Sequence, residues 1–298
     1  MAGCTTCNVC STPGTLESSV ERQQVPCNVL AFKHATFTVW RCTGCRSLHC
    51  AEDADLSLYY SDYPAHRRDP NQLGGVTLIW CNNQLRVLTR QGVKRSDHIL
   101  DYGCGAGAFV QFLKQKGYAN ASGYDPYVPA HADPKVLEER YDVIVTWDVI
   151  EHMEDACNFL RTLVALLRPG GLLVIGTPNA DDIPLTTSMP LAIPELHQPY
   201  HRHVLSEGAL LRLGRDLGLT PSLRLHRSYL DSPYPFVNVR FIWAYLAKRG
   251  GYLDVLFDGE PQPRGFLFRS PSLLFKAFFG YFFPERRNMI ITFRYAQP

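Results

Sequence analysis

A glycine-rich turn at residues 103–107 constrains the fold more than any other feature of the sequence. It follows a short apolar segment, 98-HILDY-102, whose composition predicts a β-strand, and it precedes apolar positions between 108 and 113 with helical spacing. Glycines allow the backbone to come close to a ligand, and doubly wound sheets bind ligands at the carboxyl ends of their strands. We therefore expect a ligand site at this turn.

Predicted strands and helices alternate along the central part of the chain. Further strands are predicted at 121–125, 141–147 and 172–177, and helices at about 73–91 and 156–167, with Arg168-Pro169-Gly170-Gly171 ending the last helix. This alternation is typical of the α/β class with a doubly wound parallel sheet. Asp125 ends the second strand, where a carboxylate can accept hydrogen bonds from the ribose hydroxyls of a nucleoside.

Two interpretations of the turn are open from its residues. The spacing Gly103-x-Gly105-x-x-Ala108 satisfies the loose dinucleotide fingerprint. The longer pattern D-x-G-C-G-x-G, from Asp101 to Gly107, resembles the motif of class I S-adenosylmethionine-dependent methyltransferases. The resemblance continues in order along the chain, at Asp125, at 148-DVIEHME-154, at 167-LRPGG-171 and at 201-HRHVLSEGALLRLGRDLGL-219.

The resemblance implies a Rossmann-like methyltransferase domain that binds S-adenosylmethionine. The implied cofactor-binding residues are Asp101, Gly103, Gly105, Gly107, Asp125 and Asp148. Of these, Asp101 and the turn would hold the methionine end and Asp125 the ribose. The sequence departs from the family pattern in one place, because Tyr141 follows Asp125 by only 16 positions. The third strand is therefore short or absent, and no adenine-contacting acid can be assigned.

Seven of the ten cysteines lie within the first 50 residues. Two C-x2-C pairs, Cys7/Cys10 and Cys42/Cys45, have the pattern of a tetrahedral four-cysteine zinc site, which leaves no open position for catalysis and is structural. Cys4 and Cys7 form a third C-x2-C pair, but the turn-forming residues after Cys10 favour Cys7/Cys10. Iron–sulfur binding, redox thiols and unligated cysteines remain open as alternatives.

An N-terminal four-cysteine module ahead of this fold resembles the bacterial sugar C-methyltransferases. The central block alone also resembles the O-methyltransferases of quinone biosynthesis, which lack the ribbon. We therefore expect methyl transfer to a small or carrier-linked acceptor. The leading acceptor class is a sugar, or a polysaccharide or natural-product precursor. An O- or N-methyltransferase of a lipid, quinone or other small molecule is the alternative, and a catalytically degenerate scaffold is the second alternative.

A general base is expected, because the acceptor loses a proton as it becomes a nucleophile. Histidine suits this role near neutral pH, and several histidines follow the predicted strands on the ligand-binding edge. His201 is the first candidate, followed by His152 and Tyr200.

The last two strands are predicted at 222–230 and 288–297, with an insertion at 231–287 between them. The segment 266-FLFRSPSLLFKAFFGYFF-283 is aromatic and mildly basic. Three roles are open for the insertion: a lid over the acceptor, a contact between two copies in a homodimer, or a peripheral contact with a membrane through 266–283.

The length of 298 residues suggests about two domains, at roughly 150 residues each. We place a zinc-ribbon module at 1–60 and the methyltransferase domain at 61–298. The net charge of +2 gives no reason to expect nucleic-acid binding. Neither a membrane-spanning apolar run nor a signal-peptide pattern is visible, so we expect a cytoplasmic protein.

Overall fold

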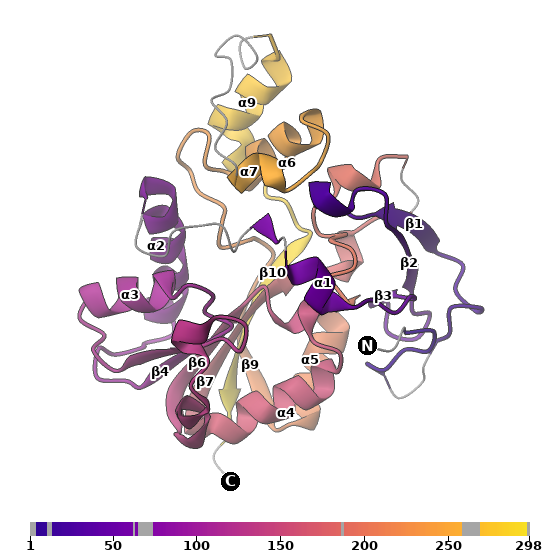
Figure 1. Cartoon of the computed structure of the whole chain (residues 1–298). Helices are drawn as coiled ribbons and strands as arrows, with labels where there is room; N and C mark the ends of the chain where they lie inside the picture. The colour runs from indigo at the N-terminus through magenta and orange to yellow at the C-terminus, as the bar shows by residue number, and fades with distance from the viewer. Residues whose placement is uncertain are drawn as a thin grey trace.

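Two β-sheets organise the chain in the computed structural model (Figure 1). The structure describes residues 4–10, 14–61, 63–64, 74–185, 188–257 and 269–296. The larger sheet has six strands, in the spatial order β5 (Ala121–Tyr124), β4 (Ile99–Tyr102), β6 (Tyr141–Trp147), β7 (Leu167–Pro178), β10 (Asn288–Tyr295) and β9 (Leu219–Leu225). The first four strands are parallel, and β10 is antiparallel to both of its neighbours.

Helices cover both faces of this sheet, which confirms the predicted α/β, Rossmann-like, doubly wound fold. On one face lie α2 (Gly75–Arg90) and α3 (Ala108–Gln115), and on the other lie α4 (Ala156–Leu166) and α5 (Glu207–Asp216). The central strands are apolar on both sides because both sides are covered. In β6, for example, Val143 and Val145 pack with α2 and α3, whereas Ile144 packs with α4 and α5.

The sheet ends at β5 in the described part of the chain, as the short spacing after Asp125 predicts. Two 3-10 turns, Pro129–His131 and Pro134–Glu138, occupy the place of a third strand. Other short 3-10 turns are Leu30–Phe32, Ile150–His152, Ala180–Asp182 and Pro190–Ala192.

Three predicted boundaries need correction. The segment expected as strand 222–230 forms β9 from Leu219 to Leu225, because Leu219 pairs with Tyr295 and the chain leaves the sheet after Leu225. The segment 201–219, which resembles the methyltransferase family, is helical only at 207–216. Ser206 accepts a hydrogen bond from the Ala209 N–H and so begins α5. Residues 168–171 belong to the start of β7 and do not merely end a helix.

The second sheet joins the N-terminal region to the rest of the chain. Its order is β1 (Arg22–Pro26), β2 (Thr36–Arg41), β3 (Leu48–Cys50) and β8 (His203–Val204), all antiparallel. The strand β8 comes from the loop region after β7, so this sheet crosses the boundary predicted at residue 60. A short helix, α1 (Leu56–Tyr60), follows the sheet.

The insertion between β9 and β10 forms a separate helical layer at one end of the molecule. It contains α6 (Val239–Lys248), α7 (Asp254–Phe257), α9 (Pro271–Phe279) and the 3-10 turn η8 (Gly280–Phe282). Phe241 of α6 packs with Leu273 and Ala277 of α9. Residues 258–268, part of the insertion, are outside the described chain. No helix in the described ranges is long and apolar enough to cross a bilayer.

Candidate active site and metal centre

The glycine turn after β4 adopts a backbone that suits glycine at three positions. Gly103, Gly105 and Gly107 have φ values of 80°, 53° and 81°, which side chains with a Cβ seldom adopt. A Cβ on Gly103 would lie 2.3 Å from the Val149 side chain, and one on Gly107 would lie 2.4 Å from His131 Nε2. A Cβ on Gly105 would meet no atom within 4 Å, so the middle of the turn borders open space.

Two carboxylates flank this turn. Asp125 accepts hydrogen bonds from the backbone N–H of Gly105 at 3.0 Å and from that of Tyr127 at 2.9 Å. Asp101 is buried, and this burial together with the nearby Asp125 charge raises its pKa to about 7. No cation of the described residues pairs with Asp101, so this carboxyl suits a ligand that brings its own positive charge.

Asp148 follows β6 in a left-handed conformation, with a φ of 52°. Its Oδ2 accepts a hydrogen bond from the Tyr229 hydroxyl at 2.9 Å, and burial raises its pKa to about 6. Tyr229 reaches this position because the chain leaves the sheet after Leu225. The Asp148 side chain also lines a cavity.

The cavity of about 580 Å³ lies between the carboxyl ends of the strands and the insertion. Its polar wall comes from the loops after β6 and β7. The residues of this wall are Asp148, Glu151, His152, Glu195, His197 and His201. Its apolar wall includes Ile242, Trp243, Leu256 and Phe257 of the insertion. Such a volume suits a small molecule or one end of a larger one.

His201 and His152 meet in this cavity, with ring centroids 4.9 Å apart. The Nδ1 of His201 lies 2.8 Å from the Glu195 carbonyl oxygen, so it donates and leaves Nε2 as an acceptor. Burial lowers the pKa of His201 to about 4 and lowers that of His152 well below its usual value. Both imidazoles are therefore neutral near pH 7 and able to accept a proton.

Tyr200, the third candidate base, lies beside these histidines but points elsewhere. It is fully buried, and its hydroxyl donates a hydrogen bond to the Tyr59 carbonyl at 2.8 Å. Burial raises the pKa of Tyr200, and this tyrosine is not among the described residues that line the cavity. The geometry favours the two histidines over Tyr200 as the base.

Glu151 belongs to the segment 148–154 that resembles the methyltransferase motif, but it was not predicted from the sequence as a site residue. Its Oε2 accepts a hydrogen bond from the Thr177 hydroxyl at 3.0 Å, and its buried Oε1 has no partner among the described residues. Burial raises the pKa of Glu151 well above its usual value. Ligand atoms of Glu151, His152 and His201 lie within 4.8 Å of one another, so the three side chains could also hold a metal ion.

Tyr60 is a further residue that the sequence did not single out. Its hydroxyl lies 2.9 Å from His152 Nδ1, and its ring stacks on Tyr127 with centroids 5.4 Å apart. Tyr127 follows Asp125, so Tyr60 connects the cofactor side of the site to the candidate base. The only signal for it was the density of tyrosines in the segment 59–72.

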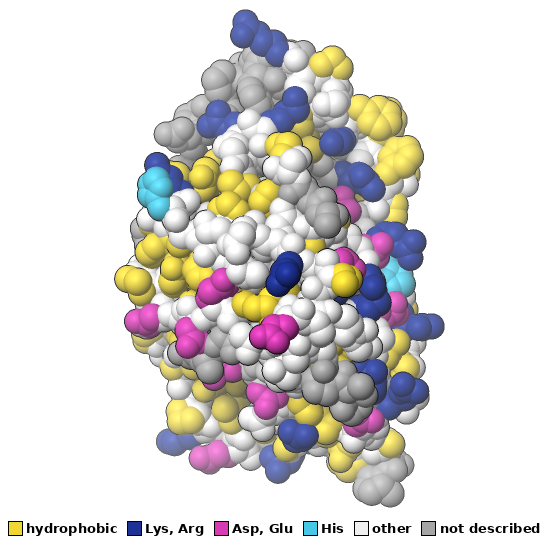
Figure 2. Space-filling model, turned by 90° about the vertical axis from the view of Figure 1, so that its right-hand side faces the viewer, with side chains coloured by type: hydrophobic (Ala, Val, Ile, Leu, Met, Phe, Trp, Pro, Cys, Tyr) yellow, Lys and Arg dark blue, Asp and Glu magenta, His cyan; other side chains and the backbone are white. Residues whose placement is uncertain are grey.

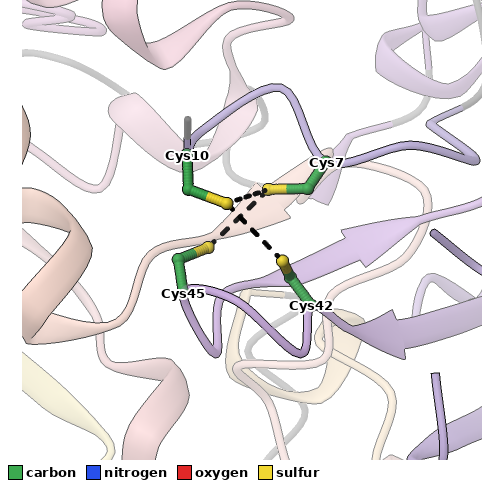
Figure 3. A group of neighbouring side chains, drawn as sticks. All are labelled: Cys7, Cys10, Cys42 and Cys45. Atoms are coloured by element: carbon green, nitrogen blue, oxygen red, sulfur yellow. Dashed lines mark hydrogen bonds between the residues drawn. The ribbon is translucent and has the colours of Figure 1, made fainter. Parts of the chain in front are cut away.

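The four predicted metal-ligating cysteines come together in the N-terminal module (Figure 3). Their sulfur atoms lie 3.7 Å apart for Cys7 and Cys10, 3.6 Å for Cys7 and Cys45, and 3.8 Å for Cys10 and Cys42. A tetrahedron with metal–sulfur bonds of about 2.3 Å has edges of about 3.8 Å. Cys4 lies outside this cluster, with its sulfur 3.6 Å from His49 Nδ1.

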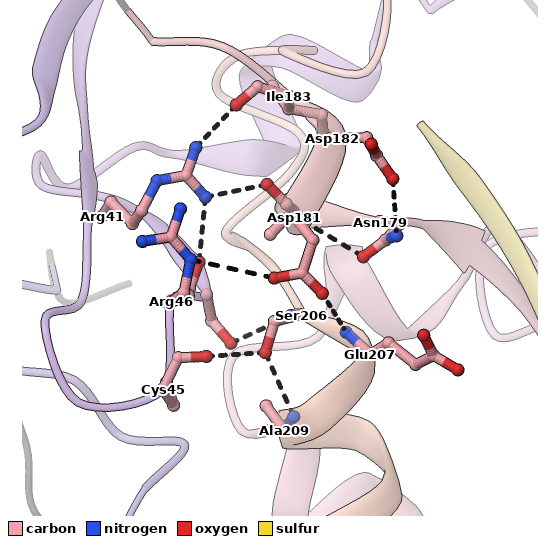
Figure 4. A network of polar contacts seen from close by, with 12 residues as sticks. Arg41, Cys45, Arg46, Asn179, Asp181, Asp182, Ile183, Ser206, Glu207 and Ala209 are labelled. Atoms are coloured by element: carbon pink, nitrogen blue, oxygen red, sulfur yellow. Dashed lines mark hydrogen bonds and ion pairs between the residues drawn. The ribbon is translucent and has the colours of Figure 1, made fainter. Parts of the chain in front are cut away.

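The second cysteine pair is tied directly to the loops of the larger domain (Figure 4). Arg41, buried beside Cys42, donates hydrogen bonds to the carbonyl oxygens of Ala180 at 2.8 Å and Ile183 at 2.6 Å. The Ser206 hydroxyl, which begins α5, donates to the Cys45 carbonyl at 2.6 Å. The cysteine module therefore holds both ends of the segment that carries His201.

Comparisons with known proteins agree with this geometry. Residues 77–222 match the protein family described as "Methyltransferase domain". Two relatives are ubiquinone biosynthesis O-methyltransferases. The one from Bradyrhizobium diazoefficiens is 31% identical over 136 residues, which are 39% of this chain and 53% of that protein. The one from Methylobacterium sp. is 34% identical over 135 residues, 38% of this chain and 54% of that protein.

A solved structure of 1,6-didemethyltoxoflavin-N1-methyltransferase from Burkholderia thailandensis is similar at 15% identity, with a TM-score of 0.45. The match covers 88% of this chain and 96% of that one. The chain spans about half the length of the curated relatives that it matches. The sheet topology is that of the Rossmann-like class I methyltransferase fold, and residues 77–222 carry the match to the methyltransferase family.

Proposed function

We propose that this protein is an S-adenosylmethionine-dependent methyltransferase that acts on a small or carrier-linked acceptor. One observation carries the proposal. The glycine turn, flanked by Asp101 and Asp125, lies at the same sheet edge as a cavity that holds His201 and His152. A binding site for a nucleoside-containing cation and a site for a proton acceptor thus lie side by side, within a matched methyltransferase domain.

The residues of the turn fit S-adenosylmethionine. Asp101 is a buried carboxylate that pairs with no cation among the described residues, and the ammonium of the methionine moiety would supply its partner. Asp125 stands at the end of β5, where it can accept hydrogen bonds from ribose hydroxyls. When bound, the cofactor supplies an electrophilic methyl group on a sulfonium.

The protein must then align the methyl donor with the acceptor and remove a proton from the acceptor. Holding donor and acceptor in near-attack geometry supplies much of the rate of a bimolecular transfer. His201 Nε2, or His152 beside it, would accept the proton of the acceptor. The neutral imidazole offers a free lone pair for this step, and the same burial that keeps it neutral makes it a weaker base than a free histidine.

We propose a sugar, or a polysaccharide or natural-product precursor, as the first acceptor class. This choice of acceptor class rests on the combination of a four-cysteine module with the methyltransferase domain. The O-methyltransferase names of the 31–34% identical relatives support the alternative of O-methylation of a lipid, quinone or other small molecule. A panel of sugar nucleotides, lipid-linked precursors and catechol-type phenols, assayed for release of S-adenosylhomocysteine, separates these classes.

Turnover that depends on one acceptor class and falls in a His201→Asn variant would support the proposal. Turnover that is equal in both proteins would contradict the assigned base. If the protein binds the cofactor but releases no S-adenosylhomocysteine with any acceptor, the catalytically degenerate scaffold becomes the favoured hypothesis.

We propose a structural zinc ion at Cys7, Cys10, Cys42 and Cys45. The sulfur–sulfur distances support it, and four protein ligands leave no position for a substrate. The cytoplasm is the compartment that we propose, because a four-thiolate site requires reduced cysteines.

A further inference from the structure

The outer side of α9 and η8 carries a cluster of five phenylalanines, which we call the aromatic face. Its members, with their exposed fractions, are Phe275 (53%), Phe278 (48%), Phe279 (51%), Phe282 (68%) and Phe283 (51%). Side chains of this size are seldom left exposed together on a soluble surface without a function. The face lies at the end of the molecule that is farthest from the C-terminus (Figure 1).

The aromatic face lies opposite the packing that holds the insertion together, and its Phe278 also contacts Phe236, which packs on Phe241. On the inner side of α9, Leu273 and Ala277 are buried against Phe241 of α6. Helix α9 is therefore apolar on two sides, and the described residues bury only one of them. A helix that is apolar beyond its core-facing stripe requires a second apolar environment.

Within the described segment 269–283, the charged side chains are all basic. Arg269 and Lys276 lie within the segment 269–283, which contains no acidic residue, and the exposed Arg286 follows it. The nearest acid in sequence, Glu285, is already engaged by Arg287 at 3.2 Å and by Arg240 at 3.9 Å. Figure 2 shows large hydrophobic side chains together with Lys and Arg side chains at this end of the molecule.

This pattern of aromatic and basic side chains fits a membrane surface with anionic lipids. Aromatic rings settle at the boundary between headgroups and acyl chains, and basic side chains are attracted by anionic headgroups. A protein partner would not by itself explain why the positive charges border the rings without acids among them.

The same insertion also forms the apolar wall of the cavity. Ile242 and Trp243 of α6 and Leu256 and Phe257 of α7 face the space in which His201 lies. An apolar wall of this kind suits a hydrocarbon chain attached to the group that reacts. The aromatic face and the cavity wall thus belong to one helical layer, α6 being packed on α9.

We propose that the aromatic face binds the interfacial region of an anionic lipid bilayer and so brings the cavity to an acceptor carried on a lipid. The part that concerns the acceptor rests on the proposed methyltransferase function. Binding to the bilayer does not, and it can be measured without catalysis.

The test is flotation of the full chain with two kinds of vesicles: phosphatidylcholine mixed with phosphatidylglycerol, and phosphatidylcholine alone. We expect the chain to float with the mixed vesicles more than with phosphatidylcholine alone. A Phe278→Ser/Phe282→Ser variant should bind about tenfold more weakly, because each ring loses its apolar contact with lipid. The matched control is Val20→Ser/Leu30→Ser, two exposed apolar residues of the N-terminal module, which should bind like the wild type.

Calorimetric binding of S-adenosylmethionine and the midpoint of urea unfolding are measured for all three proteins. Unchanged values in the phenylalanine variant show that lost flotation reports on the face and not on folding or on the cofactor site. Failure of the wild type to float with either vesicle would overturn the proposal. So would a wild-type dimer that becomes a monomer in the phenylalanine variant without any vesicle binding, because the face would then join two copies of this chain.

Discussion

Replacing Arg41 tests whether the cysteine module supports the loops that carry the proposed base or is only attached to them. Arg41 is 4% exposed and donates hydrogen bonds to the carbonyl oxygens of Ala180 and Ile183, both in the loop after β7. A hydrogen bond from a charged group contributes about 1.5–3 kcal/mol. Losing both in an Arg41→Met variant predicts a loss of about 3–6 kcal/mol in the free energy of unfolding.

Arg46 provides a matched control in the same network. Its side chain is 56% exposed, and its ion pairs with Glu21 and Asp181 are 3.9 Å and 4.0 Å long. Exposed ion pairs of this kind contribute at most about 1 kcal/mol. We therefore expect Arg46→Met to cost less than about 1 kcal/mol.

Urea unfolding, followed by tryptophan fluorescence at a fixed zinc concentration, measures both variants. An Arg41→Met variant that cost no more than Arg46→Met would refute the anchoring role of Arg41. If the loop after β7 depends on this anchor, Arg41→Met also lowers turnover in the variant that remains folded, whereas Arg46→Met does not.

Three further predictions concern the metal and the two halves of the site. Cys42→Ser should abolish stoichiometric zinc binding, measured by elemental analysis, and should lower the thermal midpoint, whereas Cys157→Ser should retain the metal because that thiol lies outside the cluster. His201→Asn should lower kcat by about 10²–10⁴-fold, as expected for loss of a general base, while the calorimetric affinity for the cofactor stays unchanged. Binding of S-adenosylmethionine should strengthen as the pH rises through about 7, because Asp101 must lose its proton to pair with the ammonium, and Asp101→Asn should remove this dependence.

Each of these predictions has an outcome that contradicts it. Zinc retained by Cys42→Ser would exclude that thiol as a ligand. A His201→Asn variant with normal kcat, together with a His152→Asn variant that has lost activity, would transfer the role of base to His152. Cofactor affinity that is independent of pH between about 6 and 8 in the wild type would mean that Asp101 does not titrate in this range.

The sequence predicts the sheet well wherever apolar runs are bounded by glycine or by an acid. The strand before the glycine turn and the strand 141–147 agree with β4 and β6 to within one residue. The missing third strand was also visible, because 16 positions between Asp125 and Tyr141 leave no room for it and two helices. The four cysteines were predictable because two C-x2-C pairs in one short module match the ligand spacing of a tetrahedral metal site.

Contacts between distant segments could not be predicted. Tyr60 contacts His152 across 92 positions, and the strand β8 at His203–Val204 joins the sheet of the N-terminal module. No local pattern marks a two-residue strand or a tyrosine hydroxyl. The start of β9 at Leu219 was missed for a similar reason, because its partner, Tyr295, is near the other end of the chain.

Calorimetric titration of the zinc-loaded chain with S-adenosylmethionine and with S-adenosylhomocysteine tests the proposed cofactor site without any knowledge of the acceptor. We expect micromolar binding that Asp125→Ala abolishes, whereas Asp216→Ala, at the exposed end of α5, binds like the wild type. Absence of binding to folded wild-type protein would contradict the proposed function. It would mean that the segment replacing the third strand closes the cofactor site, and that the domain serves as a scaffold.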